Sequence, residues 1–235
     1  MERAAFRICH EVNARPSLKS AAHAWLKHIG CGWVHYCSRN LSHVYDLHHL
    51  SALNPDRGVV VVANHRSFFD LYVLTNTILR NTNWVKQMYF PVRSSFFYER
   101  PDGIAVNAVM SALSMYPPIM RAPSKREFNK FSVDQLIAIA SQKHSLVGIH
   151  PEGTRNKTDD PYTLLPGQPG VGQIVYHARP IVIPAFVLGL SNSFPSQVAS
   201  NFNGKGEPIT MLFGPPVDLD SLLSAPAKLR TYKQI

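Results

Sequence analysis

Uninterrupted apolar runs alternate with segments of helical periodicity along most of this chain. The runs 59–63, 145–149 and 181–188 have the pattern of strands buried on both faces, which is typical of parallel sheets. We expect further strands at 44–50, 89–92 and 209–213, helices near 67–79, 103–115, 124–142 and 168–177, and a surface loop at 191–208, which is rich in Ser, Asn, Gly and Pro. The alternation predicts an α/β fold with a mainly parallel central sheet flanked by helices.

The amino-terminal segment has a different pattern, in which apolar residues recur at helical spacing and basic residues occupy much of the opposite side. The apolar positions are Leu18, Ala22, Trp25, Ile29 and Trp33, and the basic ones are Lys19, His23, Lys27 and His28. The segment 17–36 is therefore predicted to be one amphipathic helix, or two broken at Gly30-Cys31-Gly32. Its apolar stripe either packs on the rest of the protein or enters the headgroup layer of a bilayer with the basic side near anionic lipid. We predict an N-terminal helical segment, 1–42, and a main domain, 43–235.

Composition limits the class of protein and its partners. With 235 residues, 45% hydrophobic and 17% charged, the chain suits one folded domain with a large core. The net charge of +9 indicates an anionic partner: a membrane surface, a phosphate-bearing substrate or nucleic acid. We do not expect nucleic acid, because the Lys and Arg residues are dispersed and no nucleic-acid-binding motif accompanies them.

The cysteines and the apolar segments bear on cellular location. Cys9, Cys31 and Cys37 form neither an even framework nor a C-x-x-C pair, so we expect no disulfide and a reducing compartment. The start of the chain lacks the apolar core of a secretion signal, and the run 181–190 is too short to span a bilayer. These features predict a cytoplasmic protein attached peripherally to the inner face of a membrane.

The most informative chemistry follows the first buried run, where His65 and Asp70 have the spacing H-x4-D. A strand that ends at residue 63 delivers the imidazole of His65 to an exposed turn. A carboxylate in the next turn fixes the histidine tautomer and stabilises the imidazolium. We therefore expect His65 to be a general base and Asp70 the residue that orients it.

A second polar cluster, His150-Pro151-Glu152-Gly153-Thr154-Arg155-Asn156, follows the run 145–149. Together with Pro117-Pro118-Ile119-Met120-Arg121 and the segment 179–185, these motifs resemble the four ordered blocks of the glycerophosphate and lysophospholipid acyltransferase family, of the 1-acylglycerol-3-phosphate acyltransferase type. The resemblance runs from about Val44 to about Val217. Three positions depart from the family pattern: His150 is usually another aromatic residue, Asn156 is often serine, and Met120 is commonly acidic.

The resemblance implies transfer of a fatty acyl group from a thioester donor, acyl-CoA or acyl carrier protein, to the free hydroxyl of a lysophosphatidate-type acceptor at a membrane surface. His65 and Asp70 would be catalytic, and the acceptor hydroxyl would attack the donor directly without a serine nucleophile. Substrate-binding roles are expected for Arg121, Glu152, Gly153, Thr154 and Arg155, because an arginine fork grips phosphate through paired hydrogen bonds. Glu152 is expected to accept from a glycerol hydroxyl or to aim Arg155.

We expect no cofactor beyond the co-substrate and no metal, because H-x4-D alone is not a ligand set and His48-His49 would face opposite ways in a strand. Two alternatives stay open. The departures at His150, Asn156 and Met120 suggest an acyltransferase for another lysolipid, a glycolipid or glycerol 3-phosphate. The positive charge and the amphipathic N-terminus also fit a non-catalytic lipid-binding module.

Overall fold

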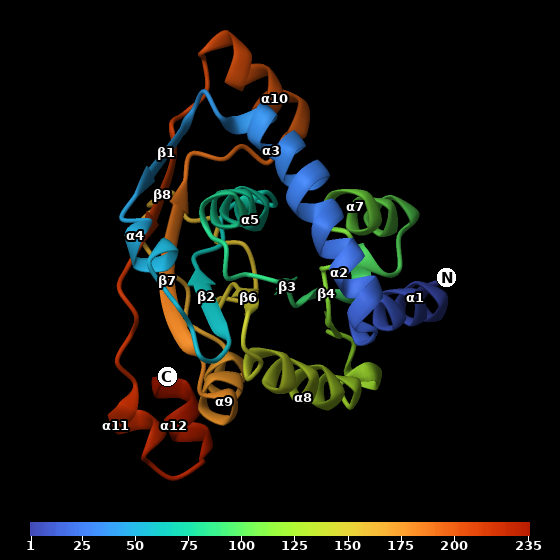
Figure 1. The fold of residues 1–235 in the computed structure, drawn as a ribbon, viewed down its shortest axis with the longest axis vertical. Helices are drawn as coiled ribbons and strands as arrows, with labels where there is room; N and C mark the ends of the chain where they lie inside the picture. Colours follow the sequence, from blue (N-terminus) through green and yellow to red (C-terminus); the bar gives the residue numbers. More distant parts are fainter.

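A six-stranded sheet forms the centre of the protein in a computed structural model that describes residues 1–235 (Figure 1). The strand order is β1-β8-β7-β2-β6-β3, and every neighbouring pair is parallel except β7 and β8. The strands are β1 (Ser42–Tyr45), β2 (Val59–Ala63), β3 (Gln87–Tyr89), β6 (Ser145–Ile149), β7 (Ile181–Leu188) and β8 (Ile209–Phe213), and β4 (Val92–Arg93) and β5 (Pro118–Ile119) form a separate small ladder. The predicted α/β class with a mainly parallel sheet is confirmed.

Helices surround this sheet. The longer ones are α1 (Glu2–Ala14), α2 (Pro16–Trp25), α3 (Cys31–Ser38), α5 (Asp70–Asn81), α7 (Pro101–Ser111), α8 (Phe128–Ala140), α9 (Pro169–Ala178) and α10 (Phe194–Asn203). The short ones are the π-helical turn η1 (Leu26–Gly30), α4 (His48–Ser51), α6 (Ser94–Phe97), the 3₁₀ turn η2 (Pro123–Lys125), α11 (Asp220–Leu223) and α12 (Leu229–Gln234). Helix α5 packs with α3, whereas α8, α9 and α12 pack together on the other side of the sheet (Figure 1).

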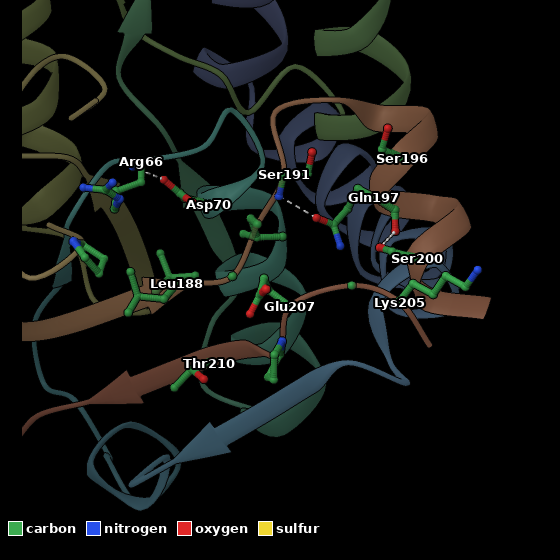
Figure 2. Close-up of a pocket in the computed structure, with 16 residues that line it drawn as sticks. Arg66, Asp70, Leu188, Ser191, Ser196, Gln197, Ser200, Lys205, Glu207 and Thr210 are labelled. Atoms are coloured by element: carbon green, nitrogen blue, oxygen red, sulfur yellow. Dashed lines mark hydrogen bonds between the residues drawn. The ribbon is translucent and has the colours of Figure 1, made fainter. Parts of the chain in front are cut away.

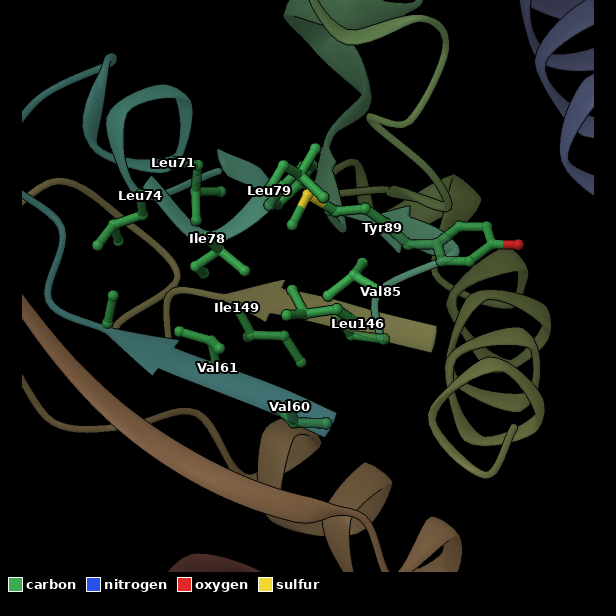
Figure 3. Packing of buried hydrophobic residues seen from close by; sticks show 14 of the residues in the cluster. Val60, Val61, Leu71, Leu74, Ile78, Leu79, Val85, Tyr89, Leu146 and Ile149 are labelled. Carbon is green, nitrogen blue, oxygen red and sulfur yellow. The ribbon is translucent and has the colours of Figure 1, made fainter. Parts of the chain in front are cut away.

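The core lies between α5 and the central strands. Figure 3 shows Leu71, Leu74 and Ile78, at helical spacing on α5, above Val61 of β2 and Ile149 of β6. All five side chains are buried in one cluster of 38 residues. Because the central strands are covered on both faces, their sequences are continuously apolar, and this is why the predicted runs 59–63 and 145–149 match β2 and β6. The predicted strands 181–188 and 209–213 match β7 and β8.

Three local predictions are wrong. The expected strand 44–50 ends at Tyr45, and His48 and His49 lie in α4 instead. The expected loop 191–208 contains α10, whose cap is the Ser193 hydroxyl accepting from the Ser196 backbone N–H. The helix expected at 124–142 begins later, since η2 occupies its first residues and α8 begins at Phe128 without a side-chain cap.

The N-terminal segment forms a nearly continuous rod of α2, η1 and α3, but its apolar stripe faces outward. Trp25, Ile29 and Trp33 are 48, 53 and 48% exposed, whereas Ala22 of the same stripe packs against the core, so the stripe packs on the domain only in part. Leu26 and Cys31 are buried instead and belong to the same core cluster as the sheet. The periodicity therefore identified the helix correctly and left open which of its faces turns inward.

Lys19 shows why a basic residue can lie on the inner side of this helix. Its side chain is 1% exposed, and its ammonium donates to Asn13 Oδ1 at 2.8 Å, to the carbonyl of Met88 at 2.8 Å and to Ser114 Oγ at 3.3 Å. The ammonium also lies 3.8 Å from the centroid of the Tyr89 ring, a favourable cation–π contact. These four contacts compensate for much of the cost of burying the charge, so a basic residue can occupy the inner face of the helix.

Candidate active site

The carboxyl ends of β2, β6 and β7 meet at one edge of the sheet. Val62 pairs with Ile149, and Ala63 pairs with Ala185, so the turns after these strands lie next to one another. Asn64 extends the pairing, because its side chain donates to the carbonyl of Val187 and accepts from the same residue's N–H. The two predicted motifs, separated by about 80 residues of chain, are thereby brought together.

The H-x4-D motif forms a closed turn around the Asp70 carboxylate. His65 Nδ1 lies 3.1 Å from Asp70 Oδ2, and the same oxygen accepts from the backbone N–H groups of Arg66 and Ser67 at 2.8 Å each. Asp70 is 1% exposed and is the first residue of α5, where the helix dipole favours a negative charge. The carboxylate is therefore fixed. It accepts a hydrogen bond from the Nδ1–H of His65, so Nε2 is the nitrogen that is free to take up a proton.

Ser67 does not have the geometry of a nucleophile. It is fully buried, and its hydroxyl donates to the carbonyl of Ser191 at 3.1 Å while accepting from the Phe69 N–H at 3.2 Å. This arrangement agrees with the expectation that the turn acts without an acyl-enzyme on serine.

Glu152 connects the two motifs. Its Oε1 accepts from the backbone N–H of His65 at 2.9 Å, and its Oε2 accepts from the N–H of Leu165 at 3.1 Å. Glu152 is buried, and both of its oxygens are committed to the backbone. It does not aim Arg155, as one prediction had it; instead, it fixes the backbone of His65.

His150 lies flat against His65. The two ring centroids are 3.9 Å apart and the ring planes differ by 7°, so the imidazoles are stacked. His150 Nδ1 is 3.0 Å from the carbonyl of Ala63, to which it donates. Burial, and to a lesser extent the neighbouring His65, lower the pKa of His150 to about 3, so this ring is neutral at physiological pH.

The arginines of the site lie near the Gly153 turn. Gly153 has a φ of +65°, a left-handed conformation that favours glycine, and the guanidinium of Arg121 donates to its carbonyl. Burial and the charge of Arg93 lower the pKa of Arg121, so these two cations are neighbours. Arg155 is exposed and donates to Asn192 Oδ1 at 2.7 Å, and Thr154 is exposed beside it.

Residues 42–188 match the family model described as Acyltransferase, which covers more than half of the chain. The chain belongs to this acyltransferase family. It is also similar to the crystal structure of the 1-acyl-sn-glycerophosphate (LPA) acyltransferase, PlsC, from Thermotoga maritima. That similarity has a TM-score of 0.51 at 17% identity and covers 93% of this chain and 77% of the other, which shows a shared fold. No curated protein sequence matches the chain.

The three positions at which this acyltransferase departs from the family pattern are held by contacts within the protein. His150 is stacked and hydrogen-bonded as described, and Met120 is buried. Asn156 is also buried, where its N–H donates to the carbonyl of His65 at 2.6 Å and its side chain donates to that of Thr163 at 2.6 Å. These departures are accommodated by local packing, so they give no reason to change the acceptor.

Sequence reasoning missed three residues that hold the site together. Arg66 donates to the carbonyls of Thr158 and Asp160, which ties the loop after the second motif to the catalytic turn. Asn192 accepts from the N–H of Phe68 at 3.1 Å as well as from Arg155. Arg93 stands beside Arg121. Arg66 lies inside the H-x4-D motif and could have been singled out, whereas Asn192 and Arg93 carry no local signal.

His65, Asp70 and His150 offer ligand atoms within 4.8 Å of one another, which raises the question of a metal site. The orientation of the groups does not favour one. The Nδ1 atoms are engaged with Asp70 and with the carbonyl of Ala63, and two parallel rings do not direct their remaining lone pairs at a common point. Metal-independent activity therefore stays our prediction.

Proposed function

We propose that this acyltransferase transfers a fatty acyl group from a thioester donor to the free hydroxyl of a lysophosphatidate-type acceptor at a membrane surface. The observation that carries the proposal is the His65–Asp70 pair, held at 3.1 Å in a turn next to a loop that carries unneutralised arginines. The same pair argues against a non-catalytic lipid-binding module, because a buried carboxylate aimed at an imidazole has no use in simple adsorption.

In the proposed reaction, the acceptor hydroxyl gives its proton to His65 Nε2 as its oxygen bonds to the thioester carbonyl carbon. Asp70 holds the Nδ1 proton and stabilises the imidazolium that forms. The tetrahedral intermediate then collapses, the carbon–sulfur bond breaks, and the leaving thiolate takes the proton back from Nε2. Both substrates must be bound together, and His65 ends the cycle neutral.

The acceptor phosphate is assigned to the arginine side of the turn. Burial and then the charge of Arg93 lower the pKa of Arg121, neither arginine forms an ion pair with a carboxylate, and Arg155 projects from the adjoining loop. A phosphate between such guanidiniums relieves their repulsion and accepts charge-assisted hydrogen bonds. This arrangement favours a phosphorylated acceptor over a glycolipid.

Membrane contact is assigned to the outward stripe of the N-terminal rod. Trp25, Ile29, Trp33 and Tyr36 are each about half exposed, and Tyr36 continues the apolar surface to Phe202 of α10, with ring centroids 5.2 Å apart. No helix has both the length and the apolar character that a membrane crossing requires. Large aromatic side chains on an exposed helix face are suited to the headgroup layer, where lysolipid acceptors reside.

Product analysis tests the proposal directly. The purified protein is offered mixed lysolipids and glycerol 3-phosphate together with a long-chain acyl-CoA or acyl carrier protein, and mass spectrometry identifies what is acylated. We expect phosphatidate as the main product and a loss of kcat of about 10²- to 10⁴-fold in His65→Ala. His48→Ala, an exposed histidine in α4, is the matched control. Turnover that survives His65→Ala, or acylation of every acceptor except lysophosphatidate, would contradict it.

A further inference from the structure

A cavity of about 660 Å³, lined largely by polar and small residues, lies beside the H-x4-D turn, on the side of β7 and β8 (Figure 2). Its walls are the carboxyl end of β7, helix α10, the segment 205–208 and the start of β8. Arg66 and Asp70 of the catalytic turn complete the lining. A molecule in the cavity is therefore separated from the general base by one side chain, since Asp70 is in direct contact with His65.

The lining determines which part of a substrate fits. Of the 16 lining residues, Val187, Leu188 and Leu190 have aliphatic side chains. The other side chains bring hydroxyl groups, an amide and charges, and they include Ser196, Ser200, Thr210, Gln197, Lys205, Glu207 and Arg66. Side chains of this kind can form hydrogen bonds along a chain of amides and hydroxyls.

Two buried side chains present hydrogen-bonding capacity to the cavity. The three donors to Asp70 all meet Oδ2, which leaves Oδ1 able to accept. Gln197, 7% exposed, uses Oε1 to accept from the backbone N–H of Ser191 and retains its side-chain N–H₂ group for a ligand. Figure 2 shows Gln197 on the α10 wall and Asp70 on the opposite one. An amide group, with one donor and one acceptor, complements both.

The cavity is lined by other residues than those assigned to the phosphate, although Arg155 reaches Asn192 beside the lining residue Ser191. None of its 16 lining residues comes from the segments that carry Arg93, Arg121 and the 150–155 turn. Direct transfer requires acceptor and donor to reach His65 at the same time. With the acceptor phosphate on the arginine side, the cavity on the other side of the turn is placed for the donor.

We propose that this cavity binds the phosphopantetheine arm of the thioester donor, with Gln197 and the hydroxyl groups along the amides and Lys205 near the phosphate end. The assignment rests on the proposed acyl transfer. Coenzyme A and holo acyl carrier protein share this arm, so the chemistry of the cavity is the same for both donors. Glu207 can accept from an amide N–H or from the hydroxyl of the arm.

Kinetics of cavity-filling variants test the assignment. Ser196→Trp, on the cavity wall of α10, is expected to raise the donor KM at least tenfold and to leave the acceptor KM within about twofold of wild type. Ala199→Trp, exposed on the same helix but not lining the cavity, is the matched control and should behave as wild type. An unchanged donor KM in Ser196→Trp, or a rise confined to the acceptor KM, would overturn the proposal.

Labelling tests binding without turnover. All three native cysteines are buried, so a cysteine introduced by Ser196→Cys is the accessible thiol, with Ala199→Cys as control. Acetyl-CoA or acetylated holo carrier protein should slow maleimide labelling of Ser196→Cys only, and whichever protects identifies the donor. Apo carrier protein should not protect. Absence of protection by both donors in a protein that still catalyses transfer would refute the cavity assignment alone, whereas absence of transfer in wild type would refute the proposed function.

Discussion

Replacement of Lys19 by methionine should remove a specific pH dependence from the stability of the protein. Burial of the ammonium lowers the pKa of Lys19 from 10.5 to about 7, although the nearby Cys9 opposes this effect. Because the unfolded chain keeps the ordinary pKa, it binds more protons than the folded protein between these two values. The free energy of unfolding therefore rises with pH across this window and is reduced most below pH 7.

The size of this effect follows from the two pKa values. At ~1.4 kcal/mol per pKa unit, the full penalty below pH 7 is on the order of 5 kcal/mol. Between pH 6 and pH 8.5 the wild-type protein should regain about 2 kcal/mol of it, which corresponds to roughly 4 to 8 °C in the unfolding midpoint of a domain of this size. Lys19→Met should show no such gain.

Thermal unfolding of both proteins is measured at half-unit steps of pH. The difference between the two unfolding midpoints at each pH gives the contribution of Lys19. Around it, Cys9 has a pKa raised to about 11 by burial, the pKa values of Tyr89, Tyr98 and Tyr116 are also raised by burial, and His23 has a pKa lowered to about 4 by burial. These groups titrate outside the window when folded and occur in both proteins. Parallel curves for wild type and Lys19→Met would refute the reasoning.

Four further outcomes are expected. His150→Ala should lower kcat at least tenfold with little change in either KM, because the ring that packs against His65 is lost, and His150→Phe should restore most of it; equal activity of the two variants would exclude a role in positioning. Arg121→Lys should raise the acceptor KM about tenfold, since a lysine cannot grip phosphate through two parallel bonds, while the donor KM stays constant. Trp25→Ser with Trp33→Ser should weaken sedimentation with anionic vesicles without slowing turnover of a monomeric short-chain acceptor, and equal losses in both assays would show a packing role. Dialysis against a chelator should leave turnover unchanged, and recovery of lost activity by a divalent metal would contradict the metal-independent mechanism.

Those parts of the fold that depend on continuous apolar runs were predictable, because a strand covered on both faces has no other pattern. Composition hid α10, whose Pro, Ser and Asn residues resemble a loop. Its boundary signals are nonetheless present in the sequence, with Ser193 as the cap, Pro195 in the first turn and Gly204, at a φ of +68°, after the last residue. Attention to these signals would have found the helix.

The inner face of the N-terminal rod could not be deduced from periodicity. The pattern separates an apolar face from a basic face, and only the tertiary structure shows that Lys19 finds three acceptors and an aromatic ring inside the protein. Because the side of the rod that carries Lys19 faces the protein, Trp25 and Trp33 on the other side face outward.

Within the site, the pair His65 and Asp70 was predictable because both residues belong to one turn. The stack of His150 on His65 depends on the pairing of β2 with β6, and the bond from the His65 N–H to Glu152 depends on where the second turn folds back. The sequence shows neither the strand register nor the path of the loop. It therefore suggested a glycerol hydroxyl or Arg155 as the partner of Glu152, and could not show the two backbone N–H groups that its oxygens accept from.

That use of the backbone explains how a site with two buried carboxylates keeps its positive charge. Asp70 accepts from two backbone N–H groups and one imidazole, and Glu152 accepts from two backbone N–H groups. Amide groups satisfy these acids without an arginine partner, so none of the guanidiniums at the site is neutralised internally. Had either carboxylate been paired with Arg121 or Arg155, a phosphate would have had to displace it and compete with a charge already in place. This separation of the two charge types, with the acids on amides and the arginines unpaired with carboxylates, is the arrangement that the proposed base and the proposed phosphate site both require.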